Sequence, residues 1–151
     1  MVPPFNASGL LPEGIHEASW LELETSLGET ATRKRLLEGL LAGLKALRVA
    51  GCTRAYIDGS FVTVKPQPGD IDVCYESGSM DFSLLEPVLK DFSNRRAAQK
   101  AKYGCEFFEA EVEAVPDGTL YLDFFQMTKD GNRKGIIALE LKDLPQEVKS
   151  D

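Results

Sequence analysis

A glycine-serine turn and a pair of carboxylates lie close together in the middle of this chain. An apolar run ends at Gly59-Ser60, and after nine intervening residues a second apolar run opens with Asp70 and Asp72. Side chains alternate along a strand, so these two carboxylates share one face while Ile71 lies on the other. Like charges this close repel each other unless a divalent cation binds between them. The spacing predicts a site for Mg²⁺ or Mn²⁺.

Two further features extend this predicted site. At Gly59 the backbone can approach a phosphate closely, and the Gly59-Ser60 turn offers N–H groups and a hydroxyl as donors. Asp123 is a third candidate acid, because it lies within an apolar run (Leu120, Leu122, Phe124 and Phe125). An unpaired carboxylate is costly to bury there, so we expect Asp123 to have a partner.

The order of these motifs resembles the nucleotidyltransferase superfamily with the fold of DNA polymerase beta, especially its small stand-alone members. The matching residues are Gly59, Ser60, Asp70, Asp72 and Asp123, and the resemblance covers residues 30 to 127. The whole chain, including residues 14–16 and 58–63, also resembles a family of small bacterial and phage proteins placed in that superfamily.

The resemblance implies transfer of a nucleoside monophosphate from an NTP to a hydroxyl on a protein, a tRNA or a small molecule. Asp70 and Asp72 would bridge two Mg²⁺ ions about 3.5–4 Å apart. Asp123 would bind the catalytic ion and help to activate the attacking hydroxyl, while Gly59 and Ser60 would hold the phosphates. Many small members carry an arginine soon after Gly-Ser; here the next cation is Lys65, either a substitute for it or a loop charge.

Other functions remain open. Asp123 is followed later in the chain by Glu140 and Lys142 in a Glu-x-Lys motif. An acid followed by this motif resembles the site of a metal-dependent nuclease. The transferase could act within a toxin-antitoxin or phage-defence system. A catalytically inactive protein of the same fold could instead be the binding or antitoxin partner of a cognate protein, and a homodimer is also open. In simpler interpretations Asp70 and Asp72 are a solvated strand start, and Asp123 pairs with a basic residue.

Composition limits the partners. The net charge is -7 and the pI is near 4.8, so the surface is poorly suited to coating nucleic acid. A small anionic ligand would need a metal or a local cationic pocket. One candidate is a predicted basic helix face, otherwise solvated, that carries Arg95, Arg96, Lys100 and Lys102. The three cysteines cannot all pair with one another, and no leader or membrane span is evident, so we expect free thiols and a cytoplasmic protein without membrane contact.

The elements expected to position the site form one α+β domain with a mixed sheet of about five strands and helices packed mainly on one face. Residues 1–18 are predicted to be an irregular arm, 19–145 the nucleotidyltransferase-like domain and 146–151 a frayed tail. Caps and apolar spacing predict helices over 19–28, 32–50, 83 onward and 94–103, with Arg33 solvated. Strands are predicted over 54–58, 70–76, 107–115, 119–127 and 135–141, the last three as an antiparallel meander.

Overall fold

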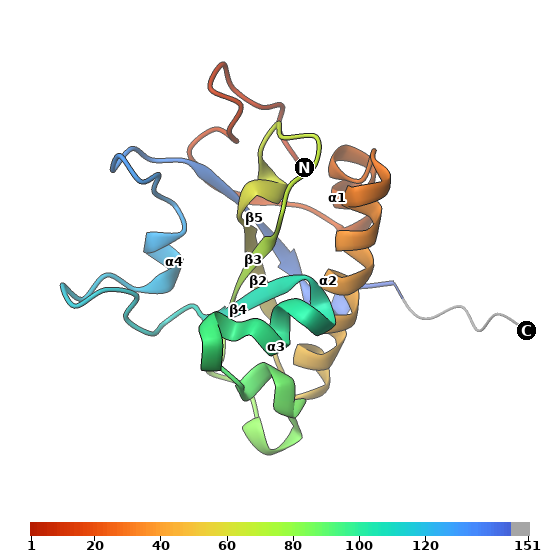
Figure 1. Cartoon of the computed structure of the whole chain (residues 1–151), viewed down its shortest axis with the longest axis vertical. Helices are drawn as coiled ribbons and strands as arrows, with labels where there is room; N and C mark the ends of the chain where they lie inside the picture. Colours follow the sequence, from red (N-terminus) through yellow and green to blue (C-terminus); the bar gives the residue numbers. More distant parts are fainter. Residues whose placement is uncertain (146–151) are drawn as a thin grey trace, which may run out of the picture.

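Five strands form one mixed sheet in the computed structural model, which describes residues 1–145 (Figure 1). The order across the sheet is β1-β5-β2-β3-β4. The central pairs β5–β2 and β2–β3 are antiparallel, whereas the outer pairs β1–β5 and β3–β4 are parallel. The predicted tail, 146–151, lies outside the described residues. The strands are β1 (Gly14–Glu17), β2 (Arg54–Asp58), β3 (Ile71–Tyr75), β4 (Cys105–Glu109) and β5 (Gly135–Glu140).

Helices α1 (Trp20–Leu27), α2 (Ala31–Val49) and α3 (Ser93–Tyr103) pack on one face of the sheet. The short helix α4 (Tyr121–Phe124) lies on the opposite side (Figure 1). The predicted α+β class, with a five-stranded mixed sheet and helices mainly on one face, is therefore confirmed. The cap predicted for the helix over 19–28 is present as a capping box, since the Ser19 hydroxyl accepts from the Glu22 amide at 3.1 Å and the Glu22 carboxylate accepts from the Ser19 amide at 3.0 Å.

The main core lies between the sheet and the leucine stripe of α2. Strand residues at odd positions, among them Ile57, Val73 and Phe107, point into this core, while even positions point to the other face. On α2, Gly43 faces Phe107, and a Cβ there would lie 2.4 Å from the ring. The small residue therefore lets the helix approach β4 closely. The even-numbered face carries the candidate acids and is covered in part by α4.

The predicted antiparallel meander of strands over 107–115, 119–127 and 135–141 is wrong. Strand β4 ends at Glu109 and runs parallel to β3, and the predicted strand over 119–127 is replaced by α4 and turns. The apolar residues there follow a helical spacing, because Tyr121 and Phe125 lie four residues apart and pack together against Phe108. Alternation of a few residues is too short a signal to separate these two periods.

Two smaller predictions also need correction. The arm is not irregular throughout, because Gly14–Glu17 adds a parallel edge strand beside β5. No α-helix starts at Ser83; two short 3-10 helices, Phe82–Leu84 and Pro87–Lys90, occupy that segment. The Asp81 carboxylate accepts from the Ser83 amide at 3.0 Å and thereby caps the first of them.

The three cysteines (Cys52, Cys74 and Cys105) are free, as expected, and all three are buried. None of the helices in the described part of the chain has the length and apolar content that crossing a membrane requires.

Candidate metal and phosphate site

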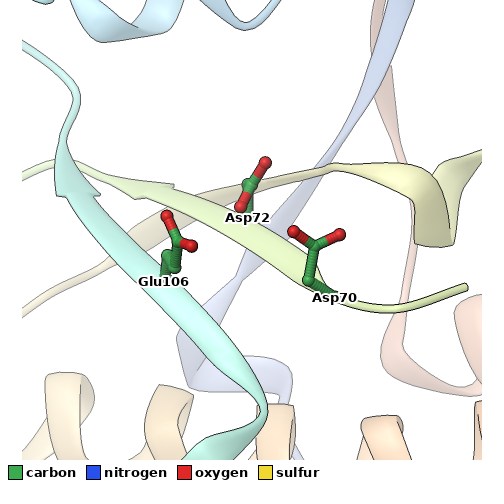
Figure 2. A group of neighbouring side chains, drawn as sticks. All are labelled: Asp70, Asp72 and Glu106. Carbon is green, nitrogen blue, oxygen red and sulfur yellow. The ribbon is translucent and has the colours of Figure 1, made fainter. Parts of the chain in front are cut away.

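Three carboxylates converge on the even-numbered face of the sheet. Asp70 lies just before β3, Asp72 lies within it, and Glu106 lies on β4 in register with Asp72. The ligand oxygens of the three lie within 4.8 Å of one another (Figure 2). Among residues 1–145 these are the acids that gather closely enough to hold one ion. The parallel pairing of β3 and β4 creates this group, because it places neighbouring side chains on the same face.

A fourth acid extends the row on the other side of Asp72. Asp58 ends β2 and pairs in register with Asp72. Its side chain is 8% exposed and forms an ion pair with Lys134, which directly precedes β5. Asp58 is thus already neutralised by a lysine, whereas Asp70 and Asp72 face Glu106.

Burial and crowding disfavour the charged forms of Asp72 and Asp58. Burial, and then repulsion from Asp70, Asp58 and Glu106, raises the pKa of Asp72 to about 7. Burial also raises the pKa of Asp58, and this effect outweighs the attraction of Lys134. A divalent cation would remove the repulsion among Asp70, Asp72 and Glu106. Partly buried carboxylate oxygens are the donors that Mg²⁺ and Mn²⁺ prefer, so the residues present fit such an ion.

The turn after β2 places Ser60 beside the acids. Gly59 adopts a φ of 91°, and a Cβ there would lie 3.0 Å from the amide nitrogen of Asp72, so both conformation and space require glycine. The Ser60 hydroxyl donates to the Asp70 carboxylate at 3.1 Å and accepts from the Gly69 amide at 3.2 Å. The turn and the start of β3 are therefore fixed to each other.

Arg33 holds the loop that follows this turn. It is buried, with 5% exposed, and its guanidinium donates to the carbonyl oxygens of Phe61 and Thr63 at 2.7 Å and of Lys65 at 2.6 Å. A further bond, at 3.2 Å, reaches Leu27 at the end of α1. The prediction that Arg33 is solvated is wrong: its position in the first turn of α2 directs it across the helix end into the loop.

An open cleft of about 450 Å³ adjoins the acids. It is lined by Ser60, Lys65, Gly69, Asp70, Lys100 and Gly104. The Lys100 ammonium lies 2.7 Å from the Glu106 carboxylate, and this hydrogen bond is the main cause that raises the pKa of Lys100. Glycines, a serine and two lysines beside a carboxylate group give a cleft that can take a phosphate chain next to a metal.

Helix α3 does not present the predicted basic face. Asn94, Arg95 and Arg96 have φ of 51–61°, so the right-handed helix starts after them. Arg96 packs over the ring of Phe108 at 4.0 Å, and Lys102 pairs with Glu86 at a distance of 2.5 Å. Of the four predicted basic residues, Lys100 lines the cleft.

The predicted site residues therefore divide into two groups. The structure brings together Gly59, Ser60, Asp70 and Asp72, with Lys65 in the adjoining cleft. Asp123 lies elsewhere: it is exposed on α4 and is not one of the converging acids. The expectation that it sits on a buried strand is wrong.

Sequence analysis missed Glu106, the role of Arg33 in holding the loop and the pair Asp58–Lys134, whereas Lys100 was predicted as part of a basic helix face. One signal for Glu106 was present. Glu106 is a single acid between Cys105 and Phe107, in a segment that directly follows Gly104 at the end of α3. This pattern is expected at the start of a strand with one polar face. The residues of the nuclease interpretation are not gathered with these acids; Glu140 pairs with Arg54 at 2.6 Å.

The α+β fold and the carboxylate cluster define a protein whose candidate site is suited to a divalent cation beside an anionic ligand. The chain belongs to a family of unknown function (DUF6932), whose model matches residues 3–140. No curated protein and no solved structure matches the chain.

Proposed function

We propose that this protein is a cytoplasmic, Mg²⁺-dependent nucleotidyltransferase that moves a nucleoside monophosphate from an NTP to a hydroxyl on a protein, a tRNA or a small molecule. The observation that carries the proposal is the register of β3 and β4, which places Glu106 beside Asp72. This supplies a third carboxylate from a neighbouring strand, the part that Asp123 was expected to play.

In this proposal Asp70, Asp72 and Glu106 would hold the metal, which would neutralise the phosphates and lower the pKa of the attacking hydroxyl. Ser60, Lys65 and Lys100 bind and orient the β and γ phosphates in the cleft. The acceptor oxygen forms a bond to the α-phosphorus of the NTP, while the bond from that phosphorus to the oxygen bridging the α- and β-phosphates breaks. Pyrophosphate leaves, and the acceptor proton passes to Glu106. Positioning and charge neutralisation suffice for such a transfer, and no nucleophilic side chain is required.

The first test is metal binding. The purified protein should bind Mn²⁺, measured by the loss of the free-ion signal in electron paramagnetic resonance. Glu106→Gln should weaken this binding at least about tenfold, because it removes one of the three charged ligands. Asp123→Asn is the matched control and should bind as the wild type does. The reverse pattern would return the third ligand to Asp123 and refute the assignment of Glu106.

The second test is transfer. Each of the four α-labelled NTPs is incubated with the protein, Mg²⁺ and a cell lysate, and the labelled product is then identified. Asp72→Asn should abolish labelling, since it removes the central metal ligand. If the wild type binds Mn²⁺ and nucleotide but labels nothing, the protein is an inactive binding partner of the same fold, and the transferase proposal fails.

A further inference from the structure

Lys100 contacts both parts of the proposed site, the group of acids and the adjoining cleft. Its ammonium lies 2.7 Å from Glu106, and its side chain lines the cleft together with Ser60 and Lys65. The helix end explains this position: Gly104 adopts a φ of 69°, its amide donates to the Lys100 carbonyl oxygen at 2.8 Å, and the chain turns directly into β4. The last turn of α3 is thereby placed beside the acid on β4.

The same carboxylate cannot fully serve both a lysine and a metal. Lys100 is 47% exposed and has a long, flexible side chain, whereas Glu106 is 19% exposed and lies on strand β4. An anion in the cleft would offer the ammonium a second partner. Metal binding at Glu106 and phosphate binding in the cleft are therefore connected through one side chain.

We propose that Lys100 is an exchangeable counter-ion, which neutralises Glu106 before the metal binds and then pairs with the triphosphate of the incoming nucleotide. This inference rests on the proposed function of the site. Its consequence is positive coupling: the metal frees Lys100 for the triphosphate, and the triphosphate keeps Lys100 away from the metal ligand. The metal alone would bind weakly, and the metal with a triphosphate would bind tightly.

The experiment compares Lys100→Ala with Lys102→Ala. Lys102 lies on the same helix and pairs with Glu86, outside the cleft lining, so it is a matched control. Two affinities are measured by calorimetry, one for Mn²⁺ alone and one for the Mg²⁺ complex of inorganic triphosphate. Circular dichroism checks that each variant is folded.

Lys100→Ala should bind Mn²⁺ alone about three- to tenfold more tightly, because the competing ion pair and a nearby positive charge are gone. It should bind Mg²⁺-triphosphate about tenfold more weakly, because a charged hydrogen bond is lost. Lys102→Ala should change neither affinity. A purely structural role for Lys100 would lower both affinities, and that result would overturn the proposal.

Asp72→Asn separates the two levels of the proposal. If it abolishes Mn²⁺ binding while Lys100→Ala leaves both affinities unchanged, the exchange is refuted and the metal site stands. If Asp72→Asn binds Mn²⁺ as tightly as the wild type, the metal site itself is refuted, and the exchange fails with it.

Discussion

Replacement of Asp72 by asparagine should stabilise the metal-free protein, and by an amount that depends on pH. The Asp72 carboxyl has a pKa of about 7 in the folded chain, against an ordinary value of 3.8. Between these values the folded state holds the proton more tightly than the unfolded state does. Stability is therefore gained as the pH falls through about 7 towards 4, and lost as the pH rises through the same window.

The size of the effect follows from the two pKa values. They differ by about three pH units, and each unit corresponds to about 1.4 kcal/mol, so ionised Asp72 costs at most about 4 kcal/mol at pH 8. Asparagine has a similar shape and stays neutral. Asp72→Asn should therefore raise the free energy of unfolding by about 2–4 kcal/mol at pH 8, and by close to zero at pH 4. For a chain of this length the difference at pH 8 corresponds to about 6–12 °C in melting temperature.

The assay is urea unfolding at several pH values between 4 and 8.5, with a chelator present. Asp130→Asn is the control, because Asp130 is exposed in a turn and surface substitutions of this kind change the free energy of unfolding by less than about 0.5 kcal/mol. Millimolar Mg²⁺ should then raise the melting temperature of the wild type at pH 8 but not that of Asp72→Asn, because binding to the folded state alone adds stability. If the difference between wild type and Asp72→Asn is the same at pH 5 and pH 8, the repulsion and burial inferred for Asp72 are wrong.

Two further predictions concern the loop after β2. Arg33→Ala should lower the free energy of unfolding, measured in urea, by about 3 kcal/mol or more, because several buried carbonyl groups lose their donor. Arg35→Ala is the control: Arg35 lies on the exposed side of α2, and its replacement should change the free energy of unfolding by less than about 0.5 kcal/mol. Gly59→Ala should cost about 2 kcal/mol or more and weaken Mg²⁺-triphosphate binding. Gly131→Ala shares the positive φ but meets no neighbour, so its cost should be near 1 kcal/mol; equal losses for the two glycines would contradict the close approach at Gly59.

Local patterns predicted the part of the fold that local physics controls. The Ser19–Glu22 capping box, the leucine stripe of α2 and the apolar runs of β2, β3 and β5 each carry their signal within a few residues. The secondary-structure predictions failed where a short segment is compatible with both the helical and the strand period. Around Asp123 a short apolar run resembled a buried strand, but contact of Tyr121 and Phe125 with Phe108 favours one helical turn.

The third carboxylate shows why a site can be predicted only in part. Asp70 and Asp72 are two residues apart on one strand, so their shared face follows from the alternation of side chains. Glu106 is distant in sequence and joins them because β4 pairs with β3, in parallel and in one register. A shift of one residue would turn Glu106 to the other face.

The sequence by itself therefore determined the Gly59-Ser60 turn, the common face of Asp70 and Asp72, and the α+β class, because each depends on short-range spacing and alternation. Only the tertiary structure decided which distant side chains complete the site. Strand pairing brought Glu106 to the acids, a helix end brought Lys100 to the cleft, and the packing of α2 brought Arg33 to the loop. These placements depend on contacts between segments far apart in the chain, and no local pattern in the sequence encodes them.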